Sequence, residues 1–428
     1  MSDPQLHPNV TNPTATAHGV NNYLPLPREQ RKGTALCLSG GGYRASLFDL
    51  GAMRRLNELG ILSQVDTLSS VSGGSIAAAF VAAHVTGRLS GKWPEPGDEV
   101  PGFDVGIARP LRELAAQNIR TSAALTRINP LNIRNPNAAS NALAGRYAEE
   151  ITTLTIAELP ERPRFVFCAT DLRFRTQWVI DGGPKRHGSE VVGYQQPIPG
   201  DWTVARAVAA SSCFPGVFPP MRLEVDAADF KGGSYQDFDR VELCRQLDIT
   251  DGGVYDNLGL EPVWQDHAVV LVSDGSPSFG PTPDLGPVWP SIRPIVTLLE
   301  QATVVRKRWL MANFLNETLD GAYWGIASLP SNYDPPADVQ VYPDDLITRV
   351  ISQVRIELDA FSKPEMAVLE NHGYLMCDLA IRQHEPGLIR NPDAPLRPPY
   401  PDWMDPQKTA RALARSHTHK LLGRGRWW

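Results

Sequence analysis

Two short segments rich in glycine and serine contain the residues that could do chemistry. Residues 39–44 are Ser-Gly-Gly-Gly-Tyr-Arg, and residues 70–74, about thirty positions later, are Ser-Val-Ser-Gly-Gly. The first segment offers backbone N–H groups that no side chain obstructs, and the second places Ser72 at a tight turn from a strand to a helix. Such donors can stabilise the oxyanion that forms when a serine attacks an ester carbonyl. The pair of segments therefore predicts acyl-transfer chemistry.

A serine nucleophile also needs a base, because its hydroxyl is weakly nucleophilic at neutral pH. Residues 251–253, Asp-Gly-Gly, offer the carboxylate of Asp251. An aspartate can accept the serine proton directly when it lies within hydrogen-bond reach and is partly desolvated. The competing carboxylates are Asp181, Asp274 and Asp256. His267 precedes an apolar strand, so a Ser-His-Asp triad stays open.

Each segment also has an alternative interpretation. Ser72 could simply cap the helix that follows it, and its neighbours Ser69, Ser70 and Ser75 offer competing hydroxyls. Residues 40–45 fit the dinucleotide-binding pattern G-x-G-x-x-A after a strand. However, Asp66 stands where the ribose-binding acid is expected, and it does not end a clear apolar strand. An oxyanion hole is therefore the favoured interpretation of the glycine row.

The elements around both segments predict a right-handed strand-helix-strand-helix unit. Residues 34–38 form a short apolar strand, and residues 45–59 repeat apolar side chains every three positions before Gly60, which is typical of a helix end. A second strand ends at Val71, and a nearly all-apolar helix follows Ser72. A parallel unit of this kind has its ligand crevice at the carboxyl ends of the strands, where both segments lie.

Further strands are expected at residues 164–170, 177–180 and 268–273, and a long helix at residues 295–314. The predicted fold is α/β, with a mostly parallel central sheet flanked by helices. We expect a leader, a catalytic domain interrupted by insertions, and a proline-rich segment with a basic C-terminal tail. These parts cover residues 1–33, residues 34–384 with insertions at 88–140, 181–200 and 220–249, and residues 385–428.

Bulk composition excludes several classes of protein. A hydrophobic content of 42% suits a packed globular core, and a net charge of −6 gives no general electrostatic case for binding nucleic acid. The N-terminus has no secretion signal, and no apolar stretch is long enough to span a membrane. The 5 cysteines are widely spaced without a Cys-x-x-Cys pair. We therefore expect reduced, buried thiols in a cytoplasmic protein.

Four sequence blocks, in order along the chain, resemble the patatin-like phospholipase family. They are SGGGYRA at 39–45, VSGGS at 71–75, ASSCFPGVFPP at 210–220 and TDGGVYDNLG at 250–259. The resemblance implies a three-layer α/β hydrolase with a Ser-Asp dyad and neither cofactor nor metal. It assigns Ser72 as nucleophile, Asp251 as base, and Gly40, Gly41 and Gly42 as the oxyanion-hole region. Ser70 replaces the first glycine of G-x-S-x-G, but serine is small enough for a tight turn.

The resemblance implies a lipid acyl hydrolase of the phospholipase A or lysophospholipase type, which cleaves carboxylic esters through an acyl-serine intermediate. The alternatives are a triad esterase that acts on small esters and a non-catalytic lipid-binding or interaction protein that keeps the fold. Arg44, a cation in the first turn of a helix, needs a compensating anion, and a lipid phosphate would serve as well as an internal carboxylate. Arg44 is therefore a candidate substrate-binding residue.

The expected partner is a phospholipid or another lipid ester. The C-terminal tail combines basic residues with Trp427 and Trp428. This composition fits a peripheral membrane anchor, in which case the cytoplasmic protein would be membrane-associated, and it fits equally a solvated basic helix packed on the domain.

Overall fold

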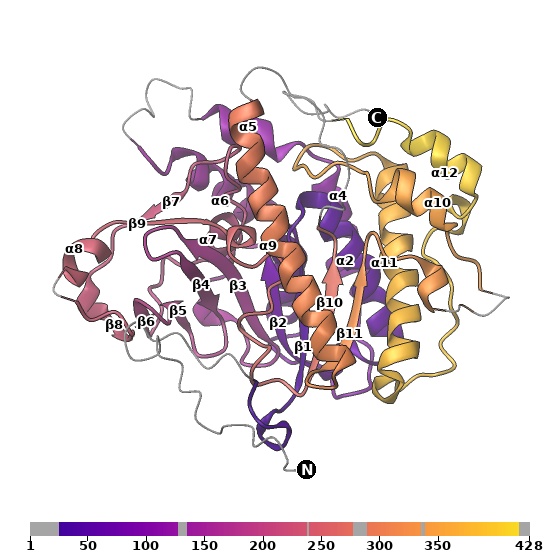
Figure 1. Ribbon diagram of the computed structural model, residues 1–428, viewed down its shortest axis with the longest axis horizontal. Helices are drawn as coiled ribbons and strands as arrows, with labels where there is room; N and C mark the ends of the chain where they lie inside the picture. The colour runs from indigo at the N-terminus through magenta and orange to yellow at the C-terminus, as the bar shows by residue number, and fades with distance from the viewer. Residues whose placement is uncertain are drawn as a thin grey trace, which may run out of the picture.

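A computed structural model of the chain describes residues 25–126, 135–237, 239–276, 289–333, 335 and 339–418. These residues form one mixed sheet of 11 strands with helices on both of its faces (Figure 1). The prediction of an α/β fold with a central sheet flanked by helices is confirmed.

Five strands on one side of the sheet are parallel, in the order β11-β10-β1-β2-β3. Their bounds are Asp320–Gly325 for β11, Val269–Asp274 for β10, Thr34–Leu38 for β1, Val65–Val71 for β2 and Arg164–Asp171 for β3. The strands predicted from the apolar runs agree with β1, β3 and β10 within about one residue. The segments β1 and β2 are buried along almost their whole length, as expected for parallel strands covered on both faces.

The remaining strands are antiparallel and extend the sheet beyond β3. They are β4 (Thr176–Asp181), β5 (Arg186–Ser189), β6 (Gly193–Gln195), β7 (Met221–Leu223), β8 (Phe230–Gly232) and β9 (Leu247–Asp251). The predicted strand at 177–180 is β4, and it pairs antiparallel with β3 because residues 172–175 form a connection that is too short for a parallel crossover. The predicted insertions at 181–200 and 220–249 are part of this extension, since they contain β5 to β8 and most of β9.

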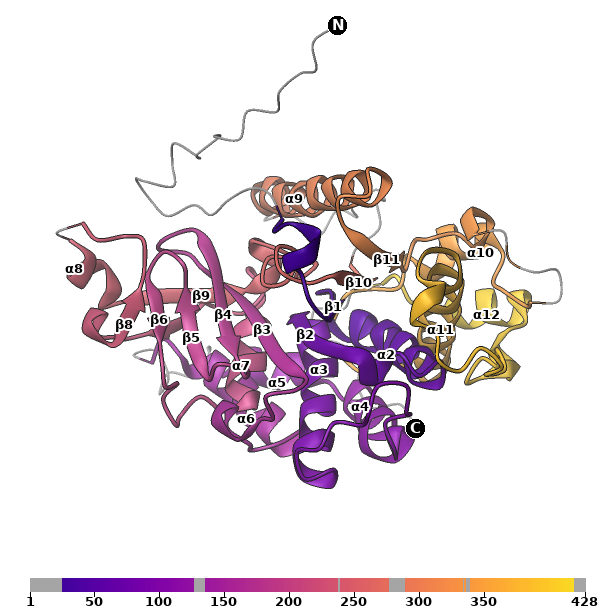
Figure 2. The ribbon, with the colours of Figure 1, turned by 90° about the horizontal axis from the view of Figure 1, so that it is seen from below.

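The helices form two layers, one on each face of the sheet (Figure 2). One face carries α9 (Trp289–Leu315), which corresponds to the long helix predicted at 295–314. The other face carries α2 (Gly42–Glu58), α3 (Gly73–Ala83), α6 (Ala138–Glu150) and α7 (Val204–Ser211). The shorter α4 (Arg109–Ala115) and α5 (Ile119–Leu125) lie within the predicted insertion at 88–140. The short α8 (Arg240–Cys244) lies beyond the antiparallel strands.

The alternation of side chains along β1 divides the core between the two layers. Leu36 and Leu38 belong to the large apolar cluster that contains α2 and α3. Ala35 and Cys37 point to the opposite face, where they share a smaller cluster with Leu310 of α9. All 5 cysteines are buried and unpaired, as predicted. Because successive residues of a strand face opposite sides, the five-residue β1 supports both layers.

The C-terminal part of the chain covers the β11 edge of the sheet. It contains α10 (Asp344–Leu346), α11 (Lys363–His384) and α12 (Pro406–Leu413), and α12 packs against α11. Residues 419–428, which include the terminal tryptophans of the predicted anchor, lie outside the described residues, as do residues 1–24 of the leader. Membrane contact through the tail stays a prediction. Within the described residues, none of the helices combines the length and apolar character needed to cross a bilayer.

Two glycines let α2 and α11 pack at very short range. A Cβ atom on Gly51 of α2 would overlap the carbonyl oxygen of Glu370, and one on Gly373 of α11 would overlap that of Phe48. A buried ion pair between Arg55 Nε and Asp378 Oδ1, at 2.7 Å, joins the same two helices. The long C-terminal helix is thereby held against the helix that begins at the glycine row.

Gly373→Ala should lower the free energy of unfolding by about 1–3 kcal/mol, because the added methyl group would meet backbone atoms that cannot move alone. Gly145→Ala in α6 is the matched control, since a Cβ there meets no atom within 4 Å. It should raise the free energy of unfolding by about 0.5–1 kcal/mol through reduced chain entropy. Urea unfolding measures both values. Equal effects in the two variants would contradict this account of the α2–α11 contact.

Candidate active site

Two strands meet end to end along one edge of β3. Val71 at the end of β2 lies opposite Cys168, and Asp251 at the end of β9 lies opposite the next residue, Ala169. The other edge of β3 is occupied by β4, so β2 and β9 share the remaining edge. Because β2 runs parallel to β3 and β9 antiparallel, both strands end at this point. Ser72, which follows β2 directly, is therefore brought beside Asp251.

Ser72 occupies a sharp turn between β2 and α3. Its backbone has φ 48° and ψ −111°, and a residue held in such a region costs on the order of 1–3 kcal/mol. The two following glycines let the turn pack closely. A Cβ on Gly73 would overlap the carbonyl oxygen of Gly42, and a Cβ on Gly74 would overlap that of Leu38. This strained strand-to-helix turn has the features of a nucleophile elbow.

The neighbouring serines make hydrogen bonds away from the turn. Ser69 Oγ donates to the carbonyl of Gly259 at 2.6 Å, and Ser70 Oγ donates to a carbonyl of β3 at 3.1 Å. Ser75 Oγ donates to Ser70 Oγ at 3.1 Å. These three serines are fully buried, whereas Ser72 is partly exposed. Ser72 is thus the hydroxyl of this segment that a substrate can approach.

The glycine row passes directly beside Ser72. A Cβ on Gly40 would lie 3.3 Å from the Cβ of Ser72. The N–H of Gly40 donates to the carbonyl of Asn257 at 3.0 Å, so this donor is already used. The N–H groups of Gly41 and Gly42 have no acceptor within the part of the chain that the structure describes. Of the three glycines predicted for the oxyanion-hole region, Gly41 and Gly42 therefore keep donors for a ligand.

Asp251 is buried, and only one of its carboxylate oxygens has a partner. Oδ1 accepts the N–H of Gly253 at 2.8 Å, while Oδ2 accepts no hydrogen bond from the described residues. Burial raises the pKa of Asp251 to about 6, although the Gly253 N–H and the nearby Ser72 hydroxyl both lower it. A carboxylate that titrates this close to neutral pH suits a general base.

The other candidate carboxylates already bind other groups of the chain. Asp274 forms an ion pair with Lys307 at 2.5 Å and accepts the hydroxyl of Tyr323 at 2.6 Å. Burial would raise the pKa of Asp274, but Lys307 and these hydrogen bonds hold it below its usual value. Asp256 accepts two backbone N–H groups, at 3.0 and 2.9 Å. Asp181 binds an arginine of β3 with both oxygens. Among the residues that the structure describes, none of the three forms a hydrogen bond with Ser72.

The histidine of the triad alternative lies at the opposite end of the sheet. His267 Nε2 contacts Thr67 Oγ1 at 2.9 Å, and its Nδ1 contacts the carboxylate of Asp266 at 2.6 Å. Thr67 precedes Ser72 by five positions on an extended strand, a separation of roughly 16 Å. No described histidine makes a hydrogen bond to Ser72 or Asp251. The structure therefore does not assemble a Ser-His-Asp triad with His267.

Arg44 links the first turn of α2, next to the glycine row, to the residue that follows β10. Its buried guanidinium donates to the carbonyl of Gly275 at 3.0 and 3.1 Å and to that of Val354 at 2.8 Å. Burial lowers the pKa of Arg44 to about 10, against the opposing effect of Asp274. The same Gly275 carbonyl packs on the glycine row, 2.7 Å from where a Cβ of Gly41 would lie. A contact of Arg44 with a substrate phosphate stays a prediction, which these internal bonds do not favour.

The sequence did not reveal the roles of two further residues. Ser211 Oγ accepts the N–H of Ser72 at 2.8 Å and donates to a carbonyl of β3 at 2.6 Å. The side-chain oxygen of Asn257 fills the space that a Cβ on Gly40 or Gly253 would need. Asn257 thus separates the glycine row from the turn after Asp251. Both residues lie within the four sequence blocks, which is the one signal that could have found them.

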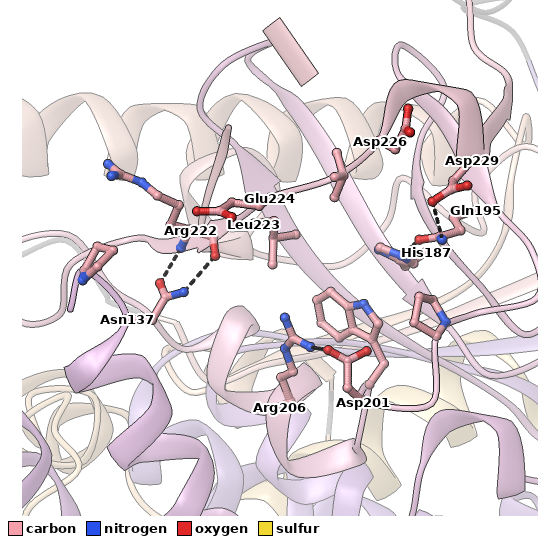
Figure 3. A pocket seen from close by; sticks show the side chains of 14 residues that line it. Asn137, His187, Gln195, Asp201, Arg206, Arg222, Leu223, Glu224, Asp226 and Asp229 are labelled. Atoms are coloured by element: carbon pink, nitrogen blue, oxygen red, sulfur yellow. Dashed lines mark hydrogen bonds and ion pairs between the residues drawn. The ribbon is translucent and has the colours of Figure 1, made fainter. Parts of the chain in front are cut away.

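A separate polar hollow of about 380 Å³ lies among β6, β7 and the start of α7 (Figure 3). Its side chains largely pair with one another. Arg206 forms an ion pair with Asp201, and Gln195 donates to Asp229 at 3.2 Å. Neither Ser72 nor Asp251 lines this hollow. It carries no part of the candidate active site.

Comparison with known proteins gives one family match and two solved structures with low similarity to this chain. The family model described as patatin-like phospholipase matches residues 36–264, more than half of the chain. Human GIVD cytosolic phospholipase A2 is 12% identical at a TM-score of 0.38, over 59% of this chain and 46% of that one. VipD from Legionella pneumophila is 16% identical at a TM-score of 0.34, over 84% of this chain and 68% of that one. A search of curated proteins finds no match.

Asp251→Asn should raise the melting temperature at pH 8. The folded pKa of about 6 exceeds the ordinary value of 3.8, so the folded protein loses stability as pH rises through this window. Above pH 6 the buried charge costs up to about 3 kcal/mol, which the neutral amide does not incur. Thermal unfolding at pH 8 and pH 4 measures the effect. The difference between the proteins should shrink at pH 4, and a difference independent of pH would contradict the assignment.

Proposed function

Because this chain belongs to the patatin-like phospholipase family, we propose that it hydrolyses lipid acyl esters with Ser72 as nucleophile and Asp251 as its base. The observation that carries the proposal is the meeting of β2 and β9 on one edge of β3, which sets an elbow serine beside a buried carboxylate. The nearby Ser72 hydroxyl lowers the pKa of Asp251, and among the described residues no histidine and no other carboxylate forms a hydrogen bond with Ser72.

In the first half-reaction, Asp251 removes the proton of the Ser72 hydroxyl as Oγ attacks the ester carbonyl. With a pKa of about 6, the carboxylate is about nine-tenths ionised at pH 7, so the base is ready to accept the proton. Its unpartnered Oδ2 is the oxygen available for this transfer. Collapse of the tetrahedral intermediate breaks the ester bond, and Asp251 returns the proton to the leaving alcohol.

The negative charge on the carbonyl oxygen needs donors that already point to it. The N–H groups of Gly41 and Gly42 have no acceptor among the described residues, and Gly73 begins α3, whose N-terminus is the positive end of the helix dipole. Hydrolysis of the acyl-serine by water completes the cycle. Each step uses groups of the chain itself. A phospholipid or lysophospholipid ester is the proposed substrate, in keeping with the family description.

A fluorophosphonate probe should label the wild-type chain once, as measured by intact mass. Ser72→Ala should abolish labelling, and Asp251→Asn should slow it by at least about 100-fold, the scale of a lost general base. His267→Ala is the control for the triad alternative and should keep the wild-type labelling rate.

Full labelling of the Ser72→Ala variant would refute the assignment of Ser72 as the nucleophile. Loss of labelling in His267→Ala, with thermal unfolding unchanged, would favour a triad. An unlabelled wild type, with or without lipid vesicles, would favour the alternative of a non-catalytic lipid-binding or interaction protein.

The rate of labelling should depend on pH through the base. Because Asp251 acts only when ionised, the rate should rise about tenfold per pH unit below pH 6 and level off above it. Stopped time courses between pH 4.5 and 8, with folding checked at each pH by circular dichroism, measure the profile. A rate that is constant from pH 5 to 7.5 would show that the activating group is not Asp251.

A further inference from the structure

Three buried polar atoms near the proposed dyad have no hydrogen-bond partner in the described part of the chain. They are Asp251 Oδ2, Ser212 Oγ and the hydroxyl oxygen of Tyr147. An unsatisfied buried polar group typically costs about 1–3 kcal/mol. Three such atoms gathered at one site point to a small polar ligand that is bound during the reaction.

Ser212 lies between two residues that bind the backbone of the dyad. Ser211 Oγ accepts the N–H of Ser72 at 2.8 Å, and the carbonyl of Cys213 accepts the N–H of Asp251 at 3.2 Å. The same carbonyl accepts a further hydrogen bond, at 2.6 Å, from a threonine hydroxyl of β9. The segment after α7 thus spans the gap between nucleophile and base. The side chain at its centre is the one left without a partner.

Tyr147 reaches the same place from the next helix. It lies on the buried face of α6, which packs against α7, and none of its surface is exposed. Burial raises the pKa of Tyr147, the nearby Ser212 hydroxyl lowers it, and Asp251 raises it. The Tyr147 phenol is therefore close to both other unpartnered groups, although it forms no hydrogen bond of ordinary geometry with either.

We propose that Tyr147 and Ser212 hold the water molecule that hydrolyses the acyl-enzyme, with Asp251 as its base. This inference rests on the proposed function and assigns two positioning residues to its second half. A bound water needs two to four polar partners. Here it would donate to Asp251 Oδ2 and Ser212 Oγ and accept the Tyr147 O–H. One lone pair of the water then remains for attack on the acyl carbon.

The step balances without any further reactant. As the water oxygen bonds to the acyl carbon, one water proton passes to Asp251 and the carbonyl becomes an oxyanion. Collapse of the intermediate breaks the bond between the acyl carbon and Ser72 Oγ, and the proton on Asp251 moves to that oxygen. The products are the carboxylic acid, which keeps the second water proton, and the free serine. Tyr147 and Ser212 only orient the water, so neither is consumed or charged.

The inference predicts that Tyr147 matters for deacylation and not for acylation. Tyr147→Phe tests this prediction, with p-nitrophenyl butyrate as the ester substrate. Acylation of Ser72 should be unchanged, so labelling by the fluorophosphonate probe and kcat/KM should stay at wild-type values. Deacylation should slow by about 100-fold, the scale of one lost positioned donor. Therefore kcat and KM should fall together, and intact mass should show the butyryl adduct on Ser72 accumulating. Ser212→Ala should act in the same direction.

Tyr342→Phe is the matched control. Tyr342 is also buried, its hydroxyl donates to the carbonyl of Trp403 at 3.1 Å, and neither Asp251 nor Tyr147 is among the groups that shift its pKa. This variant should keep the wild-type kcat. An unchanged kcat in Tyr147→Phe, or a joint loss of labelling and kcat/KM, would overturn the inference while leaving the proposed function intact. A wild type that neither takes the label nor cleaves the ester would overturn both.

Discussion

The candidate site depends on how one edge of β3 is shared. A strand edge can pair with only one neighbour at each position, and here β2 stops opposite Cys168 where β9 takes over at Ala169. The two strands arrive from opposite directions, so their carboxyl ends face each other across a single residue step. Backbone hydrogen bonds to β3 therefore set the relative positions of Ser72 and Asp251. Side-chain contacts need only refine that placement.

Close packing at the junction requires glycine where backbones nearly touch. A Cβ on Gly252 would overlap the carbonyl of Cys168 and would lie 3.1 Å from Val71 Cγ1. Gly73 and Gly74 allow equally short approaches on the other side of Ser72. These positions have a steric reason to be glycine whatever reaction the site performs. The glycines of the sequence blocks thus serve assembly of the junction as well as the supply of N–H donors.

The site is costly to fold, and the surrounding scaffold offsets that cost. It combines a strained serine, a buried carboxylate with an elevated pKa and buried hydroxyls that have no hydrogen-bond partner among the described residues. The opposing contributions are the two-sided burial of β1 and the short-range contact of α2 with α11. Because α2 begins at the glycine row, the helix that anchors the C-terminal part of the fold also orients the donors. Arg44 adds to this by binding the carbonyls of Gly275 and Val354.

The sequence predicted the parallel half of the fold better than the antiparallel half. Apolar runs and the glycines after them located β1, β2 and the helices that follow, and the motif blocks singled out Ser72 and Asp251. The strand that positions Asp251 was not predicted, because β9 has only five residues and lies in a segment without clear apolar periodicity. Tyr147 was missed for a different reason. It lies on a helix far from every motif, and only tertiary packing brings it near the base.

The central claim is that Ser72 is the nucleophile, that its base is not a histidine, and that the glycine row stabilises the oxyanion of the attacked carbonyl. A crystal structure of the chain after reaction with an alkyl fluorophosphonate tests this most directly. We expect phosphorus bonded to Ser72 Oγ, a phosphoryl oxygen within hydrogen-bond distance of the Gly41 and Gly42 N–H groups, and Asp251 as the carboxylate nearest to Oγ. An adduct on another residue, or a phosphoryl oxygen turned away from the glycine row, would contradict the account.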